Sequence, residues 1–124
     1  YQDAANKNTM FIALIEDMAG VENIEEIVSV EGVDAVLLGP FDMSVSAGHK
    51  GNVRAPQILD ALDKVIAVCR KKGIAMMHTT TNDPNVEAWV KKGVRMILQG
   101  ADSGVFARAC TDFVKSVAHL NDKL

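Results

Sequence analysis

Residues 33–44 read VDAVLLGPFDMS, and this stretch contains the pattern on which the fold prediction depends. A short apolar run is followed at once by a Gly-Pro pair, which ends a strand, and then by the carboxylate of Asp42. Residues 10–17, MFIALIED, repeat the arrangement, since an apolar run there ends on Glu16. Continuous apolar runs of this length are typical of buried parallel strands, because both faces of such strands are covered. Each of the two predicted buried strands is therefore followed by an acidic residue at its carboxyl end.

The rest of the chain alternates between strands of this kind and segments with helical periodicity. The predicted strands are apolar runs, and the predicted helices carry an apolar stripe along one face. A few helical residues are expected before the first strand, and residues 39–54 are predicted to be a Gly-containing loop with one short helical turn after Asp42. The strands are predicted at 10–15, 33–38, 73–80 and 94–98, and the helices at 21–30, 56–72, 84–92 and 102–120.

This alternation predicts an α/β fold, because consecutive parallel strands need crossover helices between them. Two architectures fit, a doubly wound sheet and a TIM-type barrel, and four strand–helix units are half of such a barrel. In both architectures ligands bind at the carboxyl ends of the strands. The polar residues at or near these ends are Glu16, Asp42, His78, Thr79 and Gln99.

The overall composition limits the classes of protein to which the chain can belong. Its 124 residues suffice for one domain or part of one, and a content of 48% hydrophobic and 23% charged residues is ordinary for a soluble globular chain. A net charge of −3 and a pI near 5.5 argue against nucleic acid or an anionic membrane as a partner. No apolar run approaches the length of a membrane span.

The start of the chain and its two cysteines give further expectations. The polar start YQDAANKN does not predict a signal peptide, and without an initiator Met we expect the chain to begin inside a longer sequence. Cys69 and Cys110 lie far apart in helical segments. We therefore predict reduced core thiols and a cytoplasmic protein rather than a disulfide.

Glu16 and Asp42 follow neighbouring predicted strands, whose ends lie about 5 Å apart in a parallel sheet. Two close carboxylates repel each other unless they share a proton or a cation, and a hard ion such as Mg²⁺ or Mn²⁺ prefers oxygen ligands. The alternative is a pair of exposed loop acids with no ligand. The turn at Gly39 and Pro40 can also point the following amide groups at an anion, or it is simply a turn.

Several spaced segments resemble the HpcH/HpaI family of metal-dependent class II pyruvate aldolases. They are IALIED, GVENIEEI, VEGVDAVLLGPFDMS, GHKGN and GADSGVFARA, and together they extend over nearly all of the chain. The resemblance implies that residues 1–124 are one partial barrel domain, the second half with strands five to eight. It also implies that Glu16 and Asp42 hold the divalent metal. The backbone of Gly39, Pro40, Phe41 and Asp42 would bind the carboxylate of pyruvate or another 2-oxo acid.

The reaction implied by the resemblance is carbon–carbon cleavage. A 4-hydroxy-2-oxo acid would give pyruvate and an aldehyde, and the metal charge would stabilise the enolate formed on cleavage. A citryl- or malyl-thioester lyase is the alternative within the wider superfamily. A catalytically silent half-barrel, serving as an assembly module or a fragment of a longer enzyme, is the alternative from another class.

The sequence departs from the family pattern in two respects. Leu14 stands where the family usually has a Gln, two residues before the metal-binding Glu. The family's His–Asp base and its Arg come from the first half of the barrel, so no residue here is assigned either role; His78 or His49 would be the substitutes for the base. Because four strands cannot close a barrel, we also expect a homo-oligomer that buries the inner face of the sheet.

Overall fold

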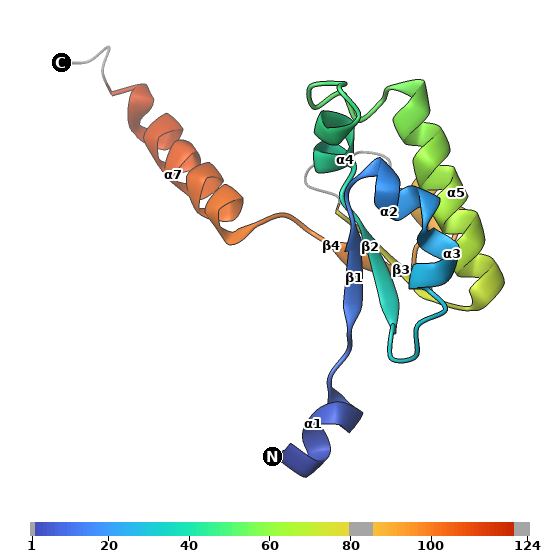
Figure 1. Ribbon diagram of the computed structural model, residues 1–124. Coiled ribbons are helices and arrows are strands. Elements are labelled where there is room, and N and C mark those ends of the chain that lie inside the picture. Colours follow the sequence, from blue (N-terminus) through green and yellow to red (C-terminus); the bar gives the residue numbers. More distant parts are fainter. Residues whose placement is uncertain (1, 80–85, 121–124) are drawn as a thin grey trace.

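The computed structural model describes residues 2–79 and 86–120, and these residues form one parallel sheet in the order β1-β2-β3-β4. Helices alternate with the strands along the chain (Figure 1), so the α/β prediction is confirmed. The elements are α1 Gln2–Asn8, β1 Ile12–Ile15, α2 Met18–Glu22, α3 Ile24–Ile27, β2 Ala35–Leu38, α4 Pro40–Ser46, α5 Pro56–Lys72, β3 Ala75–Thr79, α6 Val86–Lys92, β4 Met96–Leu98 and α7 Asp102–Ala118.

One face of the sheet is covered by helices and contains the core. Alternate strand residues point to this face, and Val36 and Leu38 on β2 are fully buried there. The long helix α5 lies across the same face, beside the short helices α2 and α3 (Figure 1). Its buried residues follow a helical spacing, and they are Ile58, Ala61, Leu62, Val65, Ile66 and Cys69.

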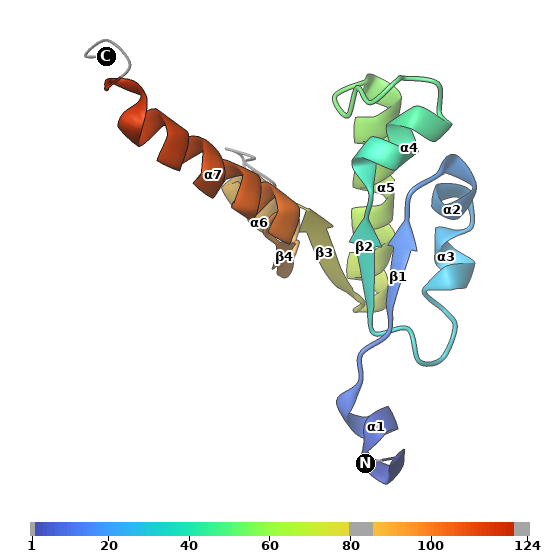
Figure 2. The same ribbon diagram turned by 90° about the vertical axis from the view of Figure 1, so that its left-hand side faces the viewer.

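None of the described helices covers the opposite face of the sheet. Figure 2 looks onto this face, with β1 and β2 in front of α5. Leu14 on β1 is 50% exposed and Leu98 on β4 is 44% exposed, although both are apolar. The last helix, α7, leaves β4 and projects away from the body, and none of its residues is buried (Figures 1 and 2). The apolar stripe predicted at 102–120 therefore does not contact the core in this chain.

All four strands begin about two residues later than predicted. Residues 10–11 and 33–34 lie outside the ladder although they belong to the same apolar runs. The reason is local at β1, where the side chain of Asp34 accepts a hydrogen bond from the backbone N–H of Phe11 at 2.7 Å. An apolar run predicts a strand, but it does not determine which amide groups enter the ladder.

The first crossover helix was wrongly predicted to start after Gly20 and to run unbroken. It begins at Met18, because the Oδ1 atom of Asp17 caps it and accepts a hydrogen bond from the Gly20 N–H at 2.6 Å. It also breaks at Asn23, whose backbone and side-chain amides both donate to the Ala19 carbonyl at 3.0 Å. Two short helices, α2 and α3, replace the predicted one.

The remaining helix predictions hold in part. α5 begins at Pro56 and ends before Gly73, which has the left-handed φ of 74° typical of a helix end. The predicted start of the next helix at 82–84 lies outside the described residues, and α6 is described from Val86. The last helix ends at Ala118, earlier than predicted. Its Cys110 is exposed and so is not the core thiol expected, whereas Cys69 on α5 is buried.

Within the two described ranges, no helix is both long enough and apolar enough to cross a membrane.

Candidate active site

The carboxyl ends of β1 and β2 lie side by side. The two strands pair in register, with Ile15 opposite Leu38, and the Gly39 N–H donates to the Ile15 carbonyl at 2.9 Å. Glu16 and Gly39, the next residues on each strand, are therefore direct neighbours. The sequence predicted acids at the ends of adjacent strands, and the strand order agrees with that prediction.

The side chain of Glu16 lies over Gly39. A Cβ atom on Gly39 would be 3.0 Å from the Cβ of Glu16, 3.6 Å from its Oε2 atom and 3.4 Å from Leu14 Cδ1. The first distance is shorter than ordinary carbon–carbon contact, so a side chain here would displace Glu16. Gly39 thus leaves the space in which the Glu16 carboxylate extends toward β2. The sequence assigned this glycine to the turn and to the carboxylate-binding backbone, and it did not predict this role beside Glu16.

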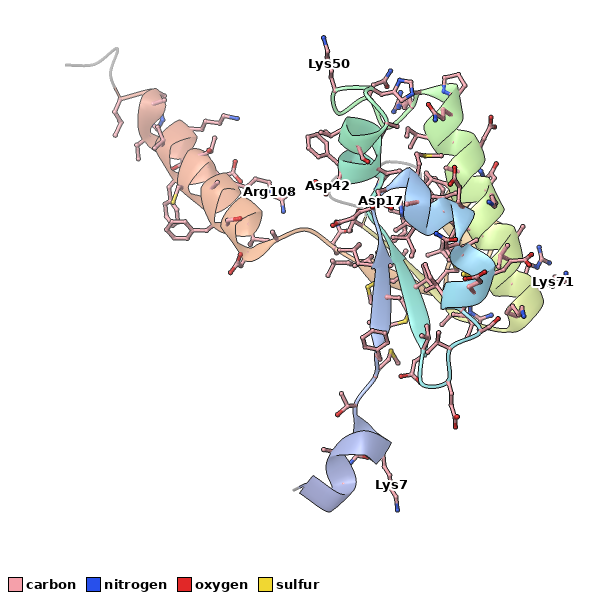
Figure 3. The ribbon with its side chains drawn as sticks, viewed as in Figure 1. Lys7, Asp17, Asp42, Lys50, Lys71 and Arg108 are labelled. Carbon is pink, nitrogen blue, oxygen red and sulfur yellow. The ribbon has the colours of Figure 1, made fainter. Side chains whose placement is uncertain are left out.

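Asp42 is held on the first turn of α4. The prediction of a loop at 39–54 is corrected here, because residues 40–46 form a helix that already includes Asp42. Gly39 is its N-cap and Pro40 its first residue, which suits a proline without an N–H group. Figure 3 labels Asp42 at the base of this helix, near the carboxyl end of β1. Both Glu16 and Asp42 are exposed.

The amides that follow the Gly-Pro pair lack helical acceptors. The N–H groups of Phe41 and Asp42 belong to the first turn of α4, where no carbonyl lies four residues earlier within the helix. Among the described residues neither amide has a hydrogen-bond acceptor, whereas the Met43 N–H donates to the Gly39 carbonyl at 3.0 Å. The two amides are therefore available to an anion.

The loop after α4 is tied to this helix by short contacts. The buried hydroxyl of Ser44 donates to the Phe41 carbonyl at 2.7 Å, and the His49 N–H donates to the Ser44 carbonyl at the same distance. Gly51, with φ of 87°, lies so close to the Phe41 ring that a Cβ atom would be 2.8 Å from Cε2. The His49 ring contacts Gln57 on α5, with 2.8 Å between Nε2 and Oε1. These contacts fix the loop against α4 and the start of α5.

Two other polar side chains near the strand ends point elsewhere. Asp17 follows Glu16 directly, but its carboxylate caps α2. His78 is 3% exposed and shares the helix-covered face with Met76, and its ring centroid lies 4.2 Å from that of Trp89 on α6. Its ring is thus on the face opposite to Leu14 and close to α6.

No group of three or more His, Cys, Asp and Glu side chains converges in a metal-binding arrangement within residues 2–79 and 86–120. The structure places both predicted site acids, Glu16 and Asp42, at neighbouring strand ends, and no third acid from the described residues joins them. The capping role of Asp17 was missed, although an acid just before an amphipathic segment is a recognised signal for a helix start.

The fold is half of a TIM-type α/β barrel, and the predicted site acids lie at the carboxyl ends of its strands. The chain belongs to the HpcH/HpaI aldolase/citrate lyase family, whose sequence profile matches residues 2–109. The resemblance found in the sequence is therefore confirmed.

Curated relatives of the chain are aldolases. The chain is 32% identical over 109 residues to a 5-keto-4-deoxy-D-glucarate aldolase of Klebsiella pneumoniae, a match that covers 88% of the chain and 43% of the relative. It is 30% identical over 109 residues to a 4-hydroxy-2-oxo-heptane-1,7-dioate aldolase of Escherichia coli, covering 88% and 42%. The chain thus spans less than half the length of these relatives.

The chain also superposes on solved structures. A citrate synthase, SbnG, superposes with a TM-score of 0.86 at 28% identity, over 97% of this chain and 49% of that one. An HpcH/HpaI aldolase from Desulfitobacterium hafniense superposes with a TM-score of 0.81 at 30% identity, over 90% of this chain and 44% of that one. Four strands alternating with helices thus correspond to about half of each known chain.

Proposed function

We propose that this chain forms the metal- and carboxylate-binding half of a carbon–carbon lyase that acts on 4-hydroxy-2-oxo acids and gives pyruvate and an aldehyde. The observation that carries the proposal is the position of the Glu16 side chain over Gly39, where two neighbouring strands end. Asp42 lies on the first turn of the helix that follows Gly39. The aldolase names of the relatives support the reaction type.

The residues at the strand ends fit a divalent cation such as Mg²⁺ or Mn²⁺. Carboxylate oxygens are the ligands that these hard ions prefer, and two carboxylates match a charge of two. The absent side chain at Gly39 supports the fit, because it leaves room for the Glu16 carboxylate above the end of β2. Glu16 and Asp42 would hold the ion, and the remaining positions would be open to substrate and water. When bound, such an ion supplies Lewis-acid polarisation of an oxygen on the substrate.

The first turn of α4 would bind the carboxylate of the 2-oxo acid. Its free amides on Phe41 and Asp42 can donate to one carboxylate, while Gly39 and Pro40 set the direction of the turn. The contacts from Gly51 and Ser44 hold Phe41 in place, so the amides are fixed before a ligand arrives. In this arrangement the chain binds and orients the acid end of its substrate.

Citrate-type chemistry is the second candidate. The family description includes citrate lyase, and the similar SbnG structure is a citrate synthase. Both would use the same acids and amides on a substrate with an additional carboxylate. Turnover of a 4-hydroxy-2-oxo acid without turnover of citrate or a citryl thioester, measured with the chain joined to the other half of the barrel, would separate the two.

The proposal includes what completes the chain. We take residues 1–124 as strands five to eight of the barrel, in a cytoplasmic protein, with the base and the Arg on the other half. The exposed inner face supports an assembly of at least two copies, or a longer chain that covers this face.

Metal binding tests the proposal most directly. Titration with Mn²⁺ should show binding that Asp42→Asn or Glu16→Gln largely abolishes, since each change removes a ligand and a charge. Asp60→Asn is the matched control, because Asp60 is an exposed acid on α5 away from the strand ends. Equal affinity in Asp42→Asn and Asp60→Asn would refute the assignment.

Turnover by the isolated chain tests whether the other half of the barrel supplies the base. The 124-residue chain alone should show little or no retro-aldol turnover, because general base catalysis contributes roughly 10²- to 10⁴-fold in rate. Pyruvate release can be followed with a coupled assay. Ordinary turnover by the isolated chain would mean that a residue within it, such as His49, acts as the base.

A further inference from the structure

Six of the 13 Lys and Arg residues of this acidic chain gather at the amino ends of β3 and β4. They are brought together because α5 and α6 both run back against the strands and end there with basic last turns. Figure 3 labels Lys71 at this end and Asp42 at the other. We call these residues the basic end, and they are Arg70, Lys71, Lys72, Lys91, Lys92 and Arg95.

A hollow of about 540 Å³ opens in the basic end. Arg70, Lys91 and Arg95 line it, and its apolar floor includes Ile74 and Met76. None of the described residues that line it is acidic. This volume is within the range of small-molecule sites, and an apolar floor with a few converging charges is their usual composition. The hollow lies at the opposite end of the strands from the candidate active site, so the proposed lyase reaction does not use it.

The positive charge exceeds what the helix ends need. Each helix C-terminus carries roughly half a negative charge, so α5 and α6 together account for about one of the six cations. Among the described residues, only Lys92 in the basic end has an ion-pair partner, the carboxylate of Asp63. About four positive charges therefore remain without a neutralising group, in a chain whose net charge is −3.

Recognition here would come from side chains and not from the backbone. The turn amides already have acceptors, since the Gly93 N–H donates to the Val90 carbonyl and the Arg95 N–H to the Met76 carbonyl, both at 3.0 Å. Two guanidinium groups remain to bind an anion, and their planar forks match phosphate oxygens in pairs.

We propose that the hollow between Arg70, Lys91 and Arg95 binds a small molecule that carries a diphosphate group. Several like charges in one hollow favour a ligand with several negative charges over a singly charged one. The apolar floor of Ile74 and Met76 gives contact area to a group attached to the diphosphate. The proposal stands independently of the lyase function.

Titration with inorganic pyrophosphate, inorganic phosphate and ADP, followed by amide chemical shifts of the chain, tests this. Pyrophosphate should cause saturable shifts at the turn amides of Gly73, Gly93 and Arg95 and leave Gly20 and Gly39 unmoved. Phosphate should bind at least about fivefold more weakly, and the affinity should fall as salt rises. Tighter binding of ADP than of pyrophosphate would identify an attached group on the apolar floor. Equal affinity would leave the diphosphate as the whole ligand.

Matched variants separate a site from general attraction. Arg95→Gln should weaken pyrophosphate binding at least about fivefold, whereas Arg54→Gln, which removes the same charge at the other end of the molecule, should leave it unchanged. Arg95→Lys keeps the charge without the fork and should show an intermediate loss. The unmoved amides of each variant show that it is folded. Non-saturable shifts, or equal losses in Arg95→Gln and Arg54→Gln, would overturn the proposal.

Discussion

The helices α5 and α7 have the same length and very different surroundings. Each has 17 residues and one apolar face. α5 buries six of its residues, whereas α7 buries none, and Phe106 and Phe113 on α7 are 72% and 75% exposed. The two helices thus differ in what lies beside them and not in their own pattern.

Their positions in the chain explain the contrast. α5 connects β2 to β3, and because these strands pair, the helix covers the seam between them. α7 follows β4, and the described residues include no later strand for it to cover. The stripe on α7 is the pattern of a helix that packs against a pair of strands, and α7 has no such contact among the described residues. An apolar helical face therefore predicts that a partner surface is needed, but not that the same chain contains it.

The largest expected effect compares a core residue of α5 with its counterpart on α7. Leu62→Ala should lower the free energy of unfolding by about 2–5 kcal/mol, because Leu62 is 2% exposed and its loss leaves a cavity. Phe113→Ala should change it by less than about 0.5 kcal/mol. Urea unfolding of both variants measures this. A loss in Phe113→Ala as large as that in Leu62→Ala would mean that α7 is packed in solution, and the contrast would fail.

The two cysteines report on the same contrast. Cys69 on α5 is buried, which raises the pKa of its thiol from 9.0 to about 11, whereas Cys110 on α7 is exposed. Iodoacetamide at pH 8 should therefore modify Cys110 at least about 100-fold faster, since Cys69 reacts only when the structure opens. Mass spectrometry of partly modified chains gives both rates. Similar rates would show that the core around α5 opens readily.

The pKa of Cys69 also predicts how stability depends on pH. Between pH 9 and about 11 the unfolded chain loses the thiol proton while the folded chain keeps it. The free energy of unfolding should therefore fall as pH rises through this window, and the contribution should be constant below it. The Cys69→Ala variant should lose this part of the slope.

Much of the fold was predictable because it rests on local patterns. The apolar runs located all four strands, and the signals at Pro56 and Gly73 located both ends of α5. What the sequence did not predict depends on single hydrogen bonds. The start of α2 is set by the cap at Asp17. The division into α2 and α3 occurs at Asn23, whose side chain competes for a backbone carbonyl and leaves the apolar spacing unchanged.

The candidate site was predictable to the level of strand ends and not beyond. Parallel alternation is enough to bring Glu16 beside the end of the next strand. The space at Gly39 could not be predicted from the sequence, because it depends on how the Glu16 side chain crosses the strand. The position of His78 needed the register of β3, which decides the face to which each residue points.

The bare inner face gives the next prediction, on assembly. The chain in dilute solution should have at least the mass of a dimer, because four open strands leave two edges and an apolar face uncovered. Leu98→Lys places a charge on this face and should weaken association at least about tenfold. Val30→Lys adds the same charge at an exposed apolar residue in a loop and is the control. Light scattering measures both variants.

A monomer that melts cooperatively would contradict this prediction. It would mean that the described elements are arranged differently in solution, with α7 or a loop over the inner face. The Phe113→Ala result distinguishes these outcomes, because only a packed α7 makes that variant unstable.

The smallest expected effect concerns Gly39, at the end of β2, over which the Glu16 side chain lies. Gly39→Ala adds a Cβ atom 3.0 Å from that of Glu16, so the carboxylate should shift and Mn²⁺ affinity should fall about fivefold, or about 1 kcal/mol. The backbone itself should tolerate the change, because φ at Gly39 is −108°. Gly104→Ala on α7 is the control, since a Cβ atom there meets nothing within 4 Å. It should leave Mn²⁺ affinity unchanged and favour the helix slightly. Equal affinity in the two variants would mean that Glu16 does not need its place over Gly39 to hold the ion.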